Sequence, residues 1–263
     1  MRRLVALLSA AACACGSADS ASDSGATPPQ APRLVLVDAL TGSSYQKGIV
    51  ACIDAKRYPA TPMPLSNVVG LAPGTGVDLG PIAVGSHELL LFDALVAKGR
   101  SDCDELKHEI TSAPTLPFTV SGNMVNVVAV VGSDTPALQV STTSASSALS
   151  PLRIEGRFQS FAAIAGTPTV TLGGTALEPR AFSVDYSPSA TLSVKLGGAA
   201  ASQTLQSVQY ASDPTTDPET FFGQRKTFLF ALVGDPAVKY DPAITADKTT
   251  GRELHLIAIP FGP

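Results

Sequence analysis

Three histidines, His87, His108 and His255, are the first residues in this chain that could do chemistry. None belongs to an HExxH motif or a similar pair, so a zinc site would need ligands gathered from distant segments. Asp104 lies one helical turn before His108, but two ligands are too few for a metal, and a solvated i,i+4 contact explains the pair better. The histidines therefore predict no metal centre.

A serine hydrolase is the second chemistry to test. Serine is abundant, but no Gly-x-Ser-x-Gly elbow is present. Ser86 and His87 are neighbours in an expected strand, so their side chains point to opposite faces and cannot act together as nucleophile and base. We predict a protein that is not an enzyme. An envelope hydrolase stays as an alternative, because a triad is defined by geometry that a sequence does not show.

Carboxylates gather in the segment 213–219, which reads DPTTDPE. Carboxylate oxygens suit calcium, so Asp213, Asp217 and Glu219 are candidate ligands for a calcium- or carbohydrate-dependent adhesion module. The segment lacks EF-hand spacing, and Asp-Pro is also typical of turns. We favour turns and predict no metal and no cofactor. The aromatic pair Phe221-Phe222 beside this segment is expected in the core.

Cys52 and Cys103 are the two cysteines outside the N-terminal leader. An even number in an exported chain predicts one disulfide. A bridge closing a loop of about 50 residues would stabilise the fold by about 4 kcal/mol in the chain-entropy model. A redox or metal role is disfavoured, because no further thiol or histidine lies at ligand spacing.

Residues 1–15 have the three regions of a secretory signal: Met1-Arg2-Arg3 is cationic, the next segment is apolar, and a small-residue tail follows. The apolar part, about nine residues, is too short to span a bilayer. The tail resembles the lipobox of bacterial lipoproteins, in which a cysteine is acylated and becomes the new N-terminus. Cys15 and Cys13 both qualify, and Gly16-Ser17 favours Cys15. An ordinary signal peptide is the alternative.

Residues 16–32 form the next segment, which lacks aromatic and branched apolar side chains. Such a segment cannot bury enough surface to fold, so it predicts a disordered tether with a reach of roughly 20 Å. The formal charge of the chain is −4, and no basic cluster follows the leader. Nucleic acid is therefore excluded as a partner, because its binding needs a positive surface.

Short β-rich runs separated by Gly and Pro dominate the rest of the chain and predict an all-β fold. The polar segment 141–150 marks a boundary between a first β-sandwich domain at 33–145 and a second at 150–263. One short helix is expected at 101–110, with Ser101 as its cap. The expected strands lie at 33–38, 48–54, 87–93, 138–140, 152–154, 169–174, 181–186, 191–195, 205–210, 226–233 and 253–259. Residues 120–131 are expected to supply two further strand arms around Ser121-Gly122-Asn123.

The two halves contain strand-like runs in the same order. The runs 127–132 and 229–234 both end in glycine, and Asp and Pro follow within a few residues. About seven short strands in about 110 residues favour two tandem Greek-key sandwiches of the immunoglobulin type. On these paired runs, the strands at Leu89 and Leu192 and the leader cysteines, the chain resembles bacterial envelope lipoproteins of unknown function with two immunoglobulin-like domains. That resemblance implies no catalytic residues.

These observations predict a lipid-anchored protein of the cell envelope with a non-catalytic binding or structural role. The membrane is the first expected partner, through the N-terminal lipid, and another envelope protein or a glycan is the second. The residue after each candidate cysteine is not acidic, and resemblance to sorted lipoproteins then indicates the outer membrane. The periplasmic and the surface-exposed side both stay open.

Overall fold

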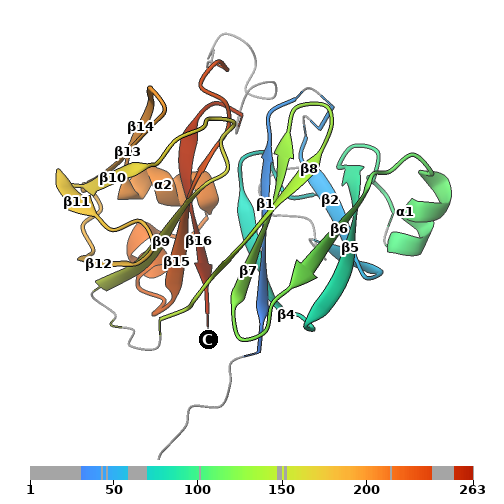
Figure 1. Cartoon of the computed structure of the whole chain (residues 1–263), viewed down its shortest axis with the longest axis horizontal. Helices are drawn as coiled ribbons and strands as arrows, with labels where there is room; N and C mark the ends of the chain where they lie inside the picture. The colour runs from blue at the N-terminus through green and yellow to red at the C-terminus, as the bar shows by residue number, and fades with distance from the viewer. Residues whose placement is uncertain are drawn as a thin grey trace, which may run out of the picture.

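The structure is a computed structural model that describes residues 31–42, 44–45, 47–58, 70–100, 102–146, 150, 153–213, 215–238 and 252–262. Its described residues form four four-stranded sheets and three short helices (Figure 1). The predicted all-β class with sandwich-like packing is confirmed. Cys13, Cys15 and most of the expected tether lie outside the described residues.

Module 1, residues 33–143, contains the first two sheets. Sheet A has the order β4-β1-β7-β8 and sheet B the order β3-β2-β5-β6. The strands are β1 (Arg33–Leu40), β2 (Ile49–Ile53), β3 (Lys56–Tyr58), β4 (Gly76–Pro81), β5 (Gly85–Asp93), β6 (Thr115–Val120), β7 (Val125–Gly132) and β8 (Ala137–Thr143). The connection between β6 and β7 crosses from sheet B to sheet A, so these two strands do not form a hairpin.

Module 2, residues 153–261, contains the other two sheets. Sheet C has the order β12-β9-β15-β16 and sheet D the order β11-β10-β13-β14. The strands are β9 (Arg153–Ser160), β10 (Thr169–Leu172), β11 (Thr175–Leu177), β12 (Phe182–Asp185), β13 (Thr191–Leu196), β14 (Ala199–Thr204), β15 (Thr227–Val233) and β16 (His255–Phe261). Adding eight to each strand number of module 1 gives the strand order of module 2, so the two modules share one topology.

The neighbours of the first strand distinguish this topology from an immunoglobulin domain. Constant-type immunoglobulin sheets run A-B-E-D and C-F-G, whereas here the first strand of each module lies between the fourth and the seventh. The pairs β1–β7 and β9–β15 are parallel. The expected immunoglobulin strand order therefore does not hold within the predicted sandwiches, because a hydrophobic run shows that a strand is buried and not which strand lies beside it.

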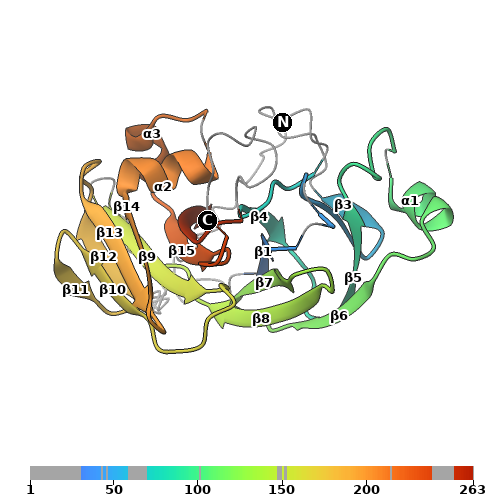
Figure 2. The ribbon, with the colours of Figure 1, turned by 90° about the horizontal axis from the view of Figure 1, so that it is seen from above.

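Three apolar cores hold the four sheets in one stack, in the order B, A, C, D (Figure 2). One core fills the space between sheets A and B, and another fills the space between C and D. The third joins the modules: Val127 of β7 and Leu229 of β15 belong to it and are both fully buried. The inner strands β1 and β7 of sheet A and β15 of sheet C are therefore buried on both faces, as expected of strands covered on both sides.

Three helices interrupt the strands: α1 (Cys103–Glu109), α2 (Leu205–Ser212) and α3 (Pro218–Phe222). The helix expected at 101–110 is present, but Asp102, not Ser101, is its N-cap. The strand expected at 205–210 is wrong, because this segment is α2. Thr204 caps α2 by accepting a hydrogen bond from Ser207 N. Leu205 and Val208 lie three residues apart on the buried face of α2, a spacing that a helix satisfies and a strand does not.

Polar contacts reinforce the junction between the modules. His255 Nε2 lies 3.0 Å from Gly74 O, and Arg252 Nη1 donates to Thr41 O over 3.3 Å. Gly76 of β4 lies so close to Ile259 of β16 that a Cβ at position 76 would be 2.1 Å from Ile259 Cδ1. The junction is therefore packed as tightly as a core. No helix among the described residues is long and apolar enough to cross a bilayer.

Candidate functional site

A groove of about 450 Å³ lies on module 1 between helix α1 and the outer face of sheet B. We call it the α1 groove. The disulfide-bonded Cys52 and Cys103 line it together with Ser86 of β5. Its charged side chains are Asp54, Glu88, Asp104 and Lys107, so carboxylates outnumber the ammonium group by three to one.

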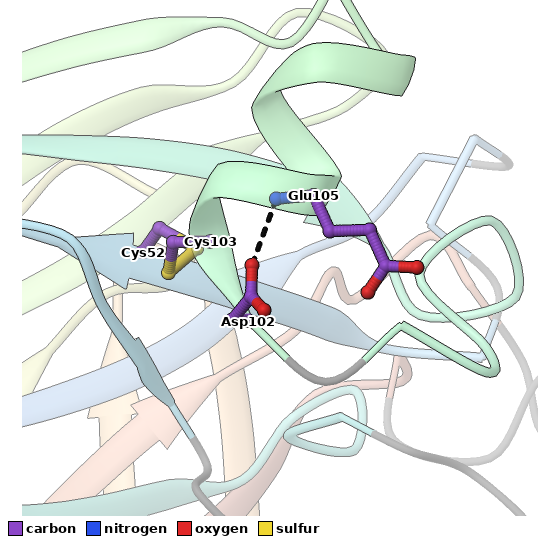
Figure 3. The surroundings of a disulfide bond; sticks show 4 residues. All are labelled: Cys52, Asp102, Cys103 and Glu105. Carbon is purple, nitrogen blue, oxygen red and sulfur yellow. Dashed lines mark hydrogen bonds between the residues drawn. A yellow bond between two sulfur atoms is a disulfide. The ribbon is translucent and has the colours of Figure 1, made fainter.

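The disulfide fixes one wall of the groove. Cys52 of β2 and Cys103 at the start of α1 form the predicted bridge, with an S–S distance of 2.08 Å. Asp102 Oδ1 accepts a hydrogen bond from Glu105 N over 2.8 Å and so caps α1 (Figure 3). Leu106, buried on the same helix, packs with Phe92 over the bridge in a small separate core. A seven-residue helix is marginal alone, so the bridge and this core hold it.

His87 forms the inner edge of the α1 groove. Its Nδ1 contacts Asp54 Oδ2, and its Nε2 lies 2.9 Å from Ala83 O. The ring is 6% exposed and stacks on Phe118 with centroids 5.4 Å apart. Asp54 sits in the tight turn between β2 and β3 with φ 47°, a conformation that Asp tolerates better than most residues. Because both ring nitrogens face protein acceptors, His87 positions Asp54 and has no free nitrogen to serve as a base.

A smaller pocket of about 240 Å³ lies on the other side of the same pair and is lined by Asp54, Tyr58, Ile82 and His87. Burial raises the pKa of Tyr58, and the nearby Asp54 carboxylate raises it further. The Asp54–His87 pair therefore contributes to two adjoining hollows at one end of module 1.

The structure keeps the three histidines apart, on β5, on α1 and on β16. Ser86 is exposed and His87 is buried, so the two side chains lie on opposite faces of β5 as expected. His108 is exposed on α1, and His255 faces backbone carbonyls of Glu253 and Gly74. Across the described ranges, no group of three or more His, Cys, Asp or Glu side chains could hold a metal ion.

The acidic segment 213–219 caps helices and closes turns. Asp213 Oδ1 accepts from Thr215 N over 3.0 Å, and Oδ2 accepts from Thr216 Oγ1 over 2.7 Å. Burial alone would raise the pKa of Asp213, but these hydrogen bonds outweigh it and the pKa lies below its ordinary value. Asp217 caps α3 by accepting from Thr220 N over 2.9 Å, and Glu219 lies exposed in the first turn.

Phe221 and Phe222 follow this segment and are buried in the core of module 2, as predicted.

One buried ionisable group was not predicted from the sequence. Asp38 on β1 is fully buried, and Arg252 of module 2, which is 5% exposed, lies close enough to lower its pKa. Burial raises the pKa of Asp38 to about 8, against the lowering effects of the Leu40 N–H and of Arg252. Within the part of the chain that the structure describes, Asp38 Oδ2 and Arg252 Nη2 have no hydrogen-bond partner. The sequence offered one signal for this site, which is a single Asp within an apolar run. Acidic residues are seldom fully buried, so an Asp at such a position indicates an unusual environment.

Comparisons with known proteins add little to this geometry. No protein-family model and no curated protein matches the chain. Among solved structures, the chain shows a low similarity to a "putative cell adhesion protein" from Bacteroides eggerthii DSM 20697, with a TM-score of 0.18 and 10% identity over 89% of this chain and 97% of that one. A similarity of this size carries no argument about fold or function.

Proposed function

We propose that this protein is a lipid-anchored, non-catalytic binding protein of the cell envelope that recognises a basic segment of another envelope component through the α1 groove. The observation that carries the proposal is the groove itself, a concave site built on a disulfide and rimmed by three carboxylates and one ammonium group. Concave sites with a few placed polar groups are the usual binding sites of proteins.

Rigidity supports a recognition role. The α1 groove is built on sheet B, and the A/B and A/C cores connect that sheet to the rest of the stack. A preformed site loses less conformational entropy when it binds a partner. Charge supports a basic partner, because opposite charges across an interface steer association.

The anchor is proposed from the sequence of residues 1–15, with Cys15 as the acylated residue and Cys13 as the alternative. Mass spectrometry of the N-terminal peptide from the mature chain tests this directly. We expect a fatty-acylated Cys15, loss of the modification in Cys15→Ser and its retention in Cys13→Ser. An unmodified N-terminus created by an ordinary signal peptidase would contradict the anchor.

The groove is tested by in-cell photocrosslinking with a photoreactive residue at position 86, which lines it. The double variant Glu88→Lys with Asp104→Lys inverts the groove charge. The matched variant Glu178→Lys with Asp185→Lys adds the same charge to exposed residues of module 2. We expect a crosslinked adduct that the first pair abolishes and the second pair leaves unchanged. An adduct insensitive to both pairs, or no adduct, would contradict the proposed site.

A further inference from the structure

Strands β8 and β16 occupy the same position in the two modules, at the edge of sheets A and C. Edge strands present unpaired N–H and C=O groups, and most proteins block them with charge, proline, a bulge or a covering element. The two strands differ in how their edges are treated, and that difference indicates a binding surface.

The edge of β16 is closed. Leu256 N donates to Gln203 Oε1 over 2.5 Å, and Ala258 N donates to Ser212 Oγ over 2.7 Å. Pro260 lies two residues further along β16, on the same edge, and has no N–H to donate. Helix α2 lies beside β16 (Figure 1), and five of the seven residues of this strand are buried. No further strand can pair with β16.

The described residues place none of these devices on the edge of β8. Its sequence, ALQVSTT, contains no charge, no proline and no glycine, and each of its residues is at least partly exposed. The strand lies at the rim of the molecule (Figure 2), and no described strand pairs with its outer side. Val140, at its centre, is 42% exposed. Thr and Val favour strand structure, so β8 is a seven-residue template for pairing.

We propose that β8 is the self-association edge of this protein, and that it pairs antiparallel with β8 of a second copy to join two A sheets into one eight-stranded sheet. A two-fold axis at Val140 places Val140 opposite itself and Gln139 opposite Ser141 of the second copy. Leu138 then faces Thr142. Two identical strands without charged residues can pair about a two-fold axis without like-charge repulsion. In a symmetric pair of charged strands, residues of the same charge would lie close together. This inference does not depend on the proposed groove function.

The pairing edge is shorter than a standard interface, so we expect a weak dimer that confinement to a surface would strengthen. Sedimentation equilibrium on the full chain should show dimer formation at ~300 µM or below. Val140→Lys should weaken the dimer by about tenfold, because two lysines then lie opposite each other in place of two valines. Val84→Lys is the matched control, since Val84 is 62% exposed in another part of module 1.

Crosslinking tests the register independently of stability. Val140→Cys treated with a short bismaleimide should give a covalent dimer, whereas Val84→Cys should give no more dimer than the wild-type chain. Thr142→Lys replaces Val140→Lys if thermal melting shows that the latter unfolds. A monomer at ~300 µM, a dimer that β8 lysines leave intact, or equal crosslinking at positions 84 and 140 would each overturn the proposal.

Discussion

Modules 1 and 2 share one strand order and differ in what has been added to it. Module 1 inserts α1 between β5 and β6, where it covers the outer face of sheet B and is held by the Cys52–Cys103 bridge. Module 2 inserts α2 and α3 between β14 and β15, where they complete the C/D core and close the edge of β16. The same framework therefore carries a groove and an open edge in module 1, and a closed, helix-covered edge in module 2.

This difference shows that strand order and surface chemistry are set separately. The framework depends on burial that both modules achieve, with sheets A and C packed against each other. The groove and the edge depend on a few residues in connections and outer strands, which the core does not constrain. Substitutions that affect one module and leave the other unchanged can therefore separate the two.

The disulfide gives the largest expected difference. Cys52→Ala with Cys103→Ala opens a loop with a sequence separation of 51 residues, and the unfolding free energy should fall by about 4 kcal/mol. Hydrogen exchange should rise first in α1 and β2, while module 2, which the bridge does not touch, keeps its protection. A wild-type denaturation midpoint that reducing agent leaves unchanged would contradict the structural role of the bridge.

The junction is probed by two leucines on opposite faces of β15. Leu229→Ala removes contacts in the core between sheets A and C, and Leu232→Ala removes contacts within module 2. Each should cost about 3 kcal/mol, as buried leucines do. Hydrogen-exchange mass spectrometry should show that Leu229→Ala also exposes β7 of module 1, whereas Leu232→Ala does not. Equal protection of β7 in both variants would mean that the modules are not coupled through this core.

The buried carboxyl group of Asp38 in module 1 makes the free energy of unfolding depend on pH. Its pKa is about 8 in the folded chain and about 3.9 when unfolded, so between these values the folded state binds more protons and stability falls as pH rises. The slope is at most about 1.4 kcal/mol per pH unit, so wild type should lose about 2 kcal/mol relative to Asp38→Asn between about pH 5.5 and 7. Urea unfolding across this range checks it; parallel curves for the two proteins would refute it.

Substitutions of Ser212 at the closed edge of β16 and of Thr142 at the open edge of β8 test whether the two edges differ. Ser212→Ala removes the acceptor of the Ala258 N–H and should cost about 1.5 kcal/mol, because a buried donor loses its partner. Thr142→Ala on β8 should have little effect on the free energy of unfolding, because water already reaches that exposed strand. Thermal melting of the two variants measures both effects. A loss at Thr142 as large as that at Ser212 would show that the β8 edge is structurally occupied.

The acidic segment of module 2 should give the smallest effect. Asp217→Ala removes the cap of α3 and should lower the melting temperature slightly, by the same amount with and without calcium. The hydrogen bonds from Thr220 lower the pKa of Asp217, so the stabilising effect of the cap is present above the pKa of the unfolded chain and lost on acidification through the folded value. Calcium binding by calorimetry, abolished in Asp217→Ala, would instead assign this loop to a metal.

Periodicity made most strands predictable, and residue chemistry made the disulfide, the α1 helix and the buried Phe221–Phe222 pair predictable. The 205–210 segment was mistaken for a strand because Leu205 and Val208 fit a short apolar run as well as a helix. The short strands β3 and β11, of three residues each, give too few side chains for any periodic signal. The sequence predicted turns at Asp213 and Asp217 from local chemistry, but it did not predict the helices α2 and α3 that these two residues cap.

The sequence by itself determined the class of the fold, its two-part order and its bridge. Alternating apolar side chains are a local signal of strands, and the two cysteines outside the leader can pair only with each other. Tertiary structure alone decided that the first strand lies parallel to the seventh, that the modules share a third core, and that Asp54 meets His87. These contacts join residues from 33 positions apart, as in Asp54–His87, to 211 positions apart, as in Thr41–Arg252 at the junction. A chain of half-buried strands can satisfy its hydrophobic pattern with many neighbours until packing selects one.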